Sequence, residues 1–101
     1  MPLIIITSAS QFDQELTGEK VLIYFTAQWC RAIGPKVEQL ANKYPDVHIL
    51  KVDIDTLNGH PLVQTVSSVP HFVARKNGAL IHEFSGASEA QLEQVLKQLT
   101  N

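Results

Sequence analysis

Hydrophobic positions along the chain switch between short apolar segments and helical spacings. Residues 21–26 are apolar throughout, which is typical of a strand covered on both faces of a sheet. Shorter apolar segments predict further strands at 3–7, 47–52, 72–75 and 79–84, and Asn77-Gly78 between the last two suits a tight hairpin turn. Spacings of three and four predict helices from Ser8 or Ser10 to Leu16, from Ile33 to Tyr44, over residues 61–66 and from Ser88 onward.

The helix ends carry capping signals. Ser10 with Asp13 three residues later resembles a capping box, and so does Ser88 with Gln91. The last helix has one apolar stripe, which we expect to be buried, formed by Leu92, Val95, Leu96 and Leu99.

The resulting order is β-α-β-α-β-α-β-β-α. Strands that alternate with helices imply a parallel core sheet, and the final hairpin adds an antiparallel edge. We therefore predict a single α/β domain over residues 1–101, with three α/β/α layers, a central mixed five-stranded sheet and four helices.

Composition excludes several classes of function. The net charge of −2 and the pI near 6.0 give no indication of nucleic-acid binding, and no apolar run is long enough to span a membrane. Cys30 is the only cysteine, so an internal disulfide is excluded and a cytoplasmic location is expected.

Five short motifs then follow one another in a familiar order: FTAQWC (25–30), KVDID (51–55), SSVPHF (67–72), KNG (76–78) and FSGAS (84–88). Together they resemble the thioredoxin family over nearly the whole chain. The resemblance implies the thioredoxin fold, a cis peptide bond before Pro70, and a substrate-binding surface formed by Trp29, Val69, Pro70, His71 and Gly86.

The active-site motif departs from this family. Its usual Trp-Cys-Gly-Pro-Cys string is replaced by Trp29-Cys30-Arg31-Ala32-Ile33-Gly34-Pro35, as if three residues were missing. The string does not tell whether Cys30 stands for the first or the second cysteine. An engineered or truncated copy of an ordinary member would give the same string, although the second departure, at Tyr24, argues against that reading.

Tyr24 stands where the family usually has a buried Asp, while the matching Lys51 is present. Because an unpaired buried ammonium is costly, we expect Lys51 to extend outward, pair elsewhere or bind the Tyr24 oxygen.

One thiol performs only half of the family's chemistry. Cys30 can attack a disulfide but has no neighbour to resolve the mixed disulfide, so turnover needs an external thiol such as glutathione. The alternative is a redox-inactive module that holds extended protein segments against Trp29, Val69, Pro70 and Gly86. With dithiothreitol as reductant, insulin reduction should be far slower than with a two-cysteine relative. A disulfide-linked homodimer through Cys30 is a further expectation under oxidation.

The histidines are weaker candidates. His71 follows Pro70 and could donate a hydrogen bond to the Cys30 sulfur, or it could be a half-exposed strand residue without a role. His48, His60 and His82 are expected to face solvent. Cys30 with His71 offers too few ligands for zinc, and Asp53 with Asp55 has nothing to complete a site, so neither a metal nor a resident cofactor is expected.

The shortened motif also predicts where the second helix begins. The three missing residues correspond to about 300° of helical rotation. If the strand over residues 21–26 and the apolar stripe of the second helix keep their places, the first turn of that helix must change its conformation. Gly34 and Pro35 suit a helix start, which leaves Cys30–Ile33 as an irregular connection. Cys30 would then lie off the helix N-terminus, and the pKa of its thiol would remain closer to that of an ordinary cysteine.

Overall fold

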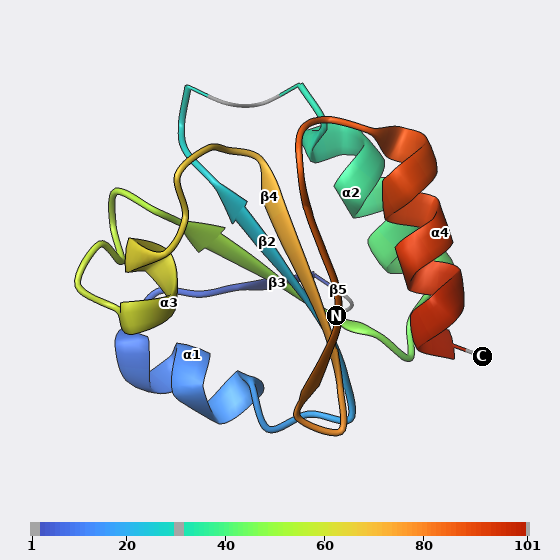
Figure 1. Cartoon of the computed structure of the whole chain (residues 1–101), viewed down its shortest axis with the longest axis horizontal. Coiled ribbons are helices and arrows are strands. Elements are labelled where there is room, and N and C mark those ends of the chain that lie inside the picture. Colours follow the sequence, from blue (N-terminus) through green and yellow to red (C-terminus); the bar gives the residue numbers. More distant parts are fainter. Residues whose placement is uncertain (1–2, 30–31, 101) are drawn as a thin grey trace.

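The computed structural model describes residues 3–29 and 32–100, and its elements follow the predicted order (Figure 1). The strands are β1 (Leu3–Ile5), β2 (Lys20–Thr26), β3 (His48–Asp53), β4 (His71–Lys76) and β5 (Ala79–Ser85). The helices are α1 (Ala9–Glu15), α2 (Gly34–Lys43), α3 (Pro61–Gln64) and α4 (Glu89–Thr100). The predicted elements are therefore confirmed, with differences of a few residues at their ends.

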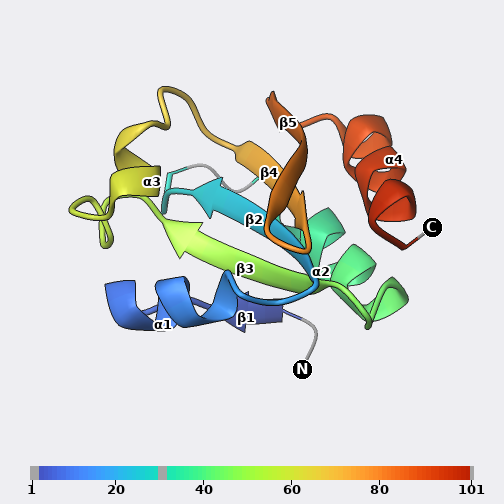
Figure 2. The ribbon, with the colours of Figure 1, turned by 60° about the horizontal axis from the view of Figure 1, so that its bottom comes forward.

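One five-stranded mixed sheet has the strand order β1-β3-β2-β4-β5, which Figure 2 shows from β1 at the bottom to β5 at the top. β1, β3 and β2 run parallel, whereas β4 and β5 are antiparallel additions. Asn77 and Gly78 have φ angles of 53° and 84°, the left-handed backbone that a two-residue hairpin turn needs. The register of this hairpin shifts between Ala74 and Arg75, because Ile81 is an extra residue on β5 between their partners His82 and Leu80.

The sheet separates two hydrophobic cores. Alternate β2 side chains point to opposite faces, so Leu22 and Tyr24 contact the core under α2 and α4, while Ile23 and Phe25 contact the core under α1 and α3. Figure 1 shows the two helix pairs on opposite sides of the sheet. The predicted α4 stripe is confirmed, because all four of its members are buried: Leu92, Val95, Leu96 and Leu99.

Helix α2 begins late, as the shortened motif predicts. Ile33 is the N-cap residue, Gly34 is the first helical residue and Pro35 follows it, where its missing N–H leaves no bond unmade. Ile33 is only 2% exposed and belongs to the core under α2 and α4, so the chain is already anchored one residue before the helix. The part of the prediction that concerns Cys30 and Arg31 lies outside the described residues.

Helix α1 is capped by a different residue from the one in the predicted box. The Ser8 hydroxyl accepts a hydrogen bond from the Gln11 N–H (3.1 Å), and the Gln11 side-chain oxygen accepts one from the Thr7 N–H (2.7 Å). Asp13 does not cap the helix, and its carboxylate binds His60 instead. The Ser8 alternative for the helix start is therefore confirmed, whereas the Ser10–Asp13 box is wrong because the helix already begins at Ala9.

His60 is buried, which corrects the expectation that it faces solvent. It is 7% exposed, and its ring contacts that of Phe12 in a tilted arrangement with the ring centroids 4.4 Å apart. Nδ1 accepts a hydrogen bond from the Leu62 N–H (3.1 Å), so Nε2 carries the proton and donates it to the Asp13 carboxylate (2.7 Å). The histidine caps α3 and ties it to α1, two helices that are far apart in sequence.

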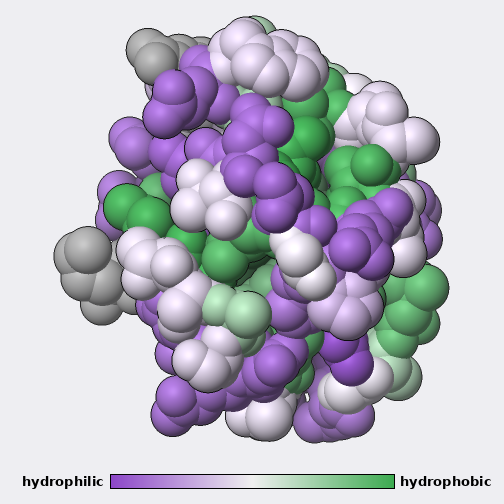
Figure 3. All heavy atoms as spheres, turned by 90° about the vertical axis from the view of Figure 1, so that its left-hand side faces the viewer, coloured by the Kyte–Doolittle hydropathy of each residue, from purple (hydrophilic) through white to green (hydrophobic). Residues whose placement is uncertain are grey.

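The face that carries α1 and α3 is a mosaic of hydrophilic and hydrophobic side chains rather than one apolar surface (Figure 3). Among the described residues, no helix is both long and apolar enough to cross a membrane.

Removal of the Asp13 carboxylate tests the link between α1 and α3. Asp13→Ala should lower the free energy of unfolding by about 1 kcal/mol, because the buried His60 N–H loses a charged acceptor. Urea denaturation measures the change. The exposed Asp46 provides a matched control, since Asp46→Ala should stay within about 0.5 kcal/mol of the parent protein. Equal effects of the two substitutions would contradict a specific His60–Asp13 contribution.

Candidate functional site

The connection from β2 to α2 carries the candidate chemistry. β2 ends at Thr26, and Gln28 and Trp29 form a turn after it. Trp29 is 73% exposed, the largest exposed fraction among the large apolar side chains described. Exposure of such a large apolar side chain to water is unfavourable. An exposed side chain of this kind is typical of a surface that contacts a partner. Cys30 follows directly in the sequence but lies outside the described residues.

The Val69-Pro70 peptide bond is cis, as predicted. It lies just before β4, whose first residue, His71, pairs with Phe25 near the end of β2. The Gly86 N–H donates a hydrogen bond to the Pro70 carbonyl oxygen (2.9 Å), which joins the two segments that enter β4 and leave β5. Gly86 has a φ of 102°, a conformation that side chains with a Cβ rarely adopt. The structure thus brings Val69, Pro70 and Gly86 together beside the end of β2.

His71 has two partners on β5 that the sequence did not reveal. Its Nδ1 lies 2.6 Å from the Ser85 hydroxyl, and its Nε2 lies 2.7 Å from the Glu83 carboxylate. An ionised carboxylate only accepts, so in the neutral ring Nε2 donates to Glu83 and Nδ1 accepts from Ser85. Both ring nitrogens are therefore occupied. A hydrogen bond from His71 to the Cys30 sulfur would have to replace one of them.

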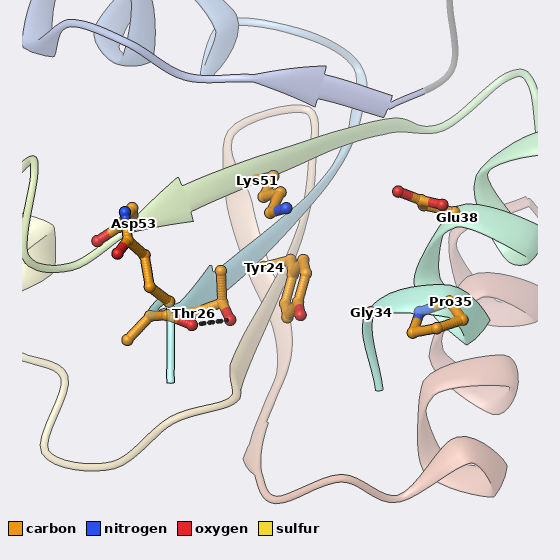
Figure 4. Close-up of a pocket in the computed structure, with 9 residues that line it drawn as sticks. Tyr24, Thr26, Gly34, Pro35, Glu38, Lys51 and Asp53 are labelled. Atoms are coloured by element: carbon orange, nitrogen blue, oxygen red, sulfur yellow. Dashed lines mark hydrogen bonds between the residues drawn. The ribbon is translucent and has the colours of Figure 1, made fainter. Parts of the chain in front are cut away.

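A cleft of about 440 Å³ opens on the other side of β2 (Figure 4). Three elements line it, because the side chains at the ends of β2 and β3 meet the first turn of α2 there. Its lining consists of Tyr24, Thr26, Ala27, Gln28, Gly34, Pro35, Glu38, Lys51 and Asp53. The sequence pointed to Tyr24 and Lys51 but not to Gln28, in the turn after β2, or to Glu38, which reaches the cleft because α2 packs on the sheet.

Tyr24 forms the inner wall of this cleft. The residue is 2% exposed, and its ring stacks on Phe72 with an interplanar angle of 7°. A Cβ placed on Gly34 would lie 4.0 Å from the Tyr24 hydroxyl oxygen, so the phenol spans from β2 to the first residue of α2. The large ring therefore occupies space under the late helix start.

Lys51 is paired with Tyr24 across β2 and β3 and is half-buried. Its ammonium makes no ion pair with a carboxylate of residues 3–29 or 32–100. In Figure 4 its amine points toward the space beside the Tyr24 ring, and the Glu38 carboxylate points there from α2. Of the three outcomes predicted for Lys51, the structure shows the first: the side chain extends outward, into the open cleft.

Asp53 closes the turn that follows β3. One of its carboxylate oxygens accepts hydrogen bonds from the backbone N–H groups of Asp55 (2.8 Å) and Thr56 (3.3 Å). Within the described part of the chain, no three His, Cys, Asp or Glu side chains cluster as metal ligands would. Asp53 therefore has a structural role in this turn and also lines the cleft.

Comparison with known proteins places these features in a family. The family model described as Thioredoxin matches residues 3–98. Thioredoxin-3 of Dictyostelium discoideum is 41% identical over 95 residues, which cover 91% of each chain, and thioredoxin-1 of Schizosaccharomyces pombe is 38% identical over 96 residues, 91% of this chain and 93% of that one. The crystal structure of thioredoxin O2 from Arabidopsis thaliana in the oxidised state is 34% identical, with a TM-score of 0.87 over 99% of this chain and 96% of that chain.

Replacement of His71 separates its role on β5 from a role at the thiol. His71→Thr should leave the rate at which iodoacetamide alkylates Cys30 unchanged within about twofold, because both ring nitrogens already bind Ser85 and Glu83. Mass spectrometry of quenched samples measures this rate across pH 6–9. A tenfold lower rate in the variant would instead identify His71 as a residue that stabilises the thiolate.

Proposed function

This chain belongs to the thioredoxin family, and we propose that it exchanges disulfides through Cys30 alone, with an external thiol completing each cycle. The observation that carries the proposal is the single cysteine directly after Trp29, in a motif that lacks the second thiol. The exposed indole and the cis Val69-Pro70 segment support retention of the substrate-binding surface in spite of this loss.

The chemistry needs two equivalents of an external thiol. The Cys30 thiolate attacks one sulfur of a substrate disulfide, and the other substrate sulfur leaves as a thiolate and is protonated. A glutathione thiolate then breaks the mixed disulfide and releases the second substrate thiol, which leaves glutathione bound to Cys30. A second glutathione removes it as glutathione disulfide. Two electrons pass from two glutathione molecules to one substrate disulfide, and Cys30 is regenerated.

The substrate class is a protein segment in extended conformation. Val69 lies just before β4 with its backbone next to the cis bond, where an extended peptide can pair with it as an added strand. Trp29 provides the apolar area for this contact.

A cytosolic location is part of the proposal, since the cytosol supplies reduced glutathione.

A second candidate function is a binding module without redox turnover. The 73% exposure of Trp29 favours it, because this apolar surface serves a partner whether or not Cys30 reacts. The two functions make different demands on Cys30, so a single substitution separates them.

Reduction of insulin disulfides tests the proposed exchange. Glutathione should drive reduction by the parent protein well above the rate with glutathione alone, and Cys30→Ser should abolish the increase because no other thiol exists in the chain. Turbidity of the released insulin chains measures the rate. With dithiothreitol, the rate should stay far below that of a two-cysteine relative.

The intermediate provides the control. Without glutathione, mass spectrometry should find insulin chains held on Cys30 as a mixed disulfide. If parent and Cys30→Ser proteins are equally inactive while a partner still binds both, exchange is refuted and the binding module is supported. A Trp29→Ala variant should weaken binding in either case.

Oxidation without a substrate should join two chains. Because Cys30 has no internal partner, mild peroxide should convert two thiols into one Cys30–Cys30 disulfide, with peroxide reduced to water. Non-reducing electrophoresis should show a dimer that disappears in Cys30→Ser. A monomeric band with an unmodified thiol would show instead that Cys30 is shielded from solvent.

A further inference from the structure

We propose that the cleft between β2, β3 and α2 binds the external thiol, and that this thiol carries an α-amino acid group, as glutathione does. The inference rests on the proposed function, which requires such a thiol without locating it. Figure 4 shows the charged side chains that would receive it: Lys51 from β3, Glu38 from α2 and Asp53 from the end of β3.

Position is the first argument. A thiolate attacks a disulfide sulfur in line with the bond that breaks, so the resolving thiol must reach Cys30 from the side opposite the substrate. Val69, Pro70 and Gly86 lie on the β4 and β5 side of β2, whereas the cleft lies on the β3 side. Gln28, which lines the cleft, precedes Cys30 by only two positions.

Size is the second argument. Pockets that bind small molecules typically measure about 300–1,000 Å³. The cleft, at about 440 Å³, falls within that range and is open to solvent at the exposed Glu38 and Pro35 side chains. A tripeptide-sized thiol therefore has room to enter. The buried Tyr24 ring, whose hydroxyl lies near Gly34, forms the floor of the cleft.

Charge is the third argument. Lys51 is half-buried and its ammonium has no carboxylate partner among residues 3–29 and 32–100, so a ligand carboxylate would satisfy a cation that is partly removed from water. Glu38, whose carboxylate points toward the same space, offers an anionic partner for an ammonium, and Asp53 adds a second carboxylate to the lining. Carboxylate and ammonium on one small molecule are the signature of an amino acid. A neutral thiol such as 2-mercaptoethanol has neither group.

The step at this cleft balances as follows. The bound thiolate attacks the Cys30 sulfur of the mixed disulfide, a new S–S bond forms between them, and the bond from Cys30 to the substrate breaks. The electron pair leaves with the substrate sulfur, which takes a proton from solvent. Cys30 is then joined to the small thiol, and a second molecule of that thiol releases it as the symmetric disulfide.

Release of a coloured thiol tests the cleft directly. The parent protein is first converted with Ellman's reagent to the mixed disulfide of Cys30 with thionitrobenzoate, whose release is followed by absorbance. Glutathione should release it with a rate that saturates as glutathione concentration rises, whereas 2-mercaptoethanol should give a linear dependence. Lys51→Met should slow release by glutathione about tenfold at low concentration, and leave release by 2-mercaptoethanol unchanged.

Two controls and one direct binding measurement keep the result independent of folding. Lys97→Met changes an exposed lysine of α4 that does not line the cleft, and should behave as the parent protein. A glutathione diester, with both carboxylates blocked, should lose the saturation in the parent protein itself. S-methylglutathione should bind Cys30→Ser protein by calorimetry, and bind the Cys30→Ser, Lys51→Met protein at least tenfold more weakly.

The failure of this inference differs from a failure of the exchange itself. If glutathione and its diester release thionitrobenzoate with the same linear dependence, and Lys51→Met changes neither, the cleft does not bind the thiol although exchange through Cys30 stands. If neither glutathione nor 2-mercaptoethanol releases thionitrobenzoate, exchange through Cys30 fails, and the cleft proposal fails with it.

Discussion

The packing of α2 against the sheet is the constraint on which the candidate site depends. Val37, Leu40 and Ala41 are each 1% exposed, and Ile33 joins the same core one residue before the helix. A close-packed stripe cannot rotate or slide without leaving cavities or clashes. Any shortening of the preceding connection must therefore be absorbed between β2 and Gly34, which is where the helix begins.

Tyr24 is the counterpart of this constraint on the sheet. Its ring stacks on Phe72 below, and its hydroxyl approaches the first residue of α2. A small acidic side chain at this position would not reach across the same space. The aromatic residue and the late helix start therefore fit each other, and the cleft beside them is bounded by Lys51 and Glu38. The connection that carries the single cysteine is thus accompanied by an open, charged site on one side of β2 and the cis Val69-Pro70 segment on the other.

The histidines show how tertiary contacts assign roles that composition hides. His60 and Asp13 are 47 residues apart in sequence, and nothing local to either marks them as partners. Only the packing of α3 next to α1 buries the imidazole and directs its N–H at the carboxylate. His71 differs, because its partners lie across a hairpin and depend on the pairing of β4 with β5.

The sequence by itself determined the elements, their order and the hairpin turn at Asn77-Gly78, because each depends on backbone preferences and apolar periodicity within a few residues. It also placed the single thiol after Trp29. The helix start at Gly34 and the cis bond before Pro70 were predicted through the family resemblance. The tertiary structure decided the rest. A simple two-residue hairpin would place His71 opposite Phe84, and the extra residue Ile81 on β5 moves it opposite Ser85. The cleft likewise exists only where three elements meet, since the positions of its charged side chains are set by long-range packing rather than by neighbours in the chain.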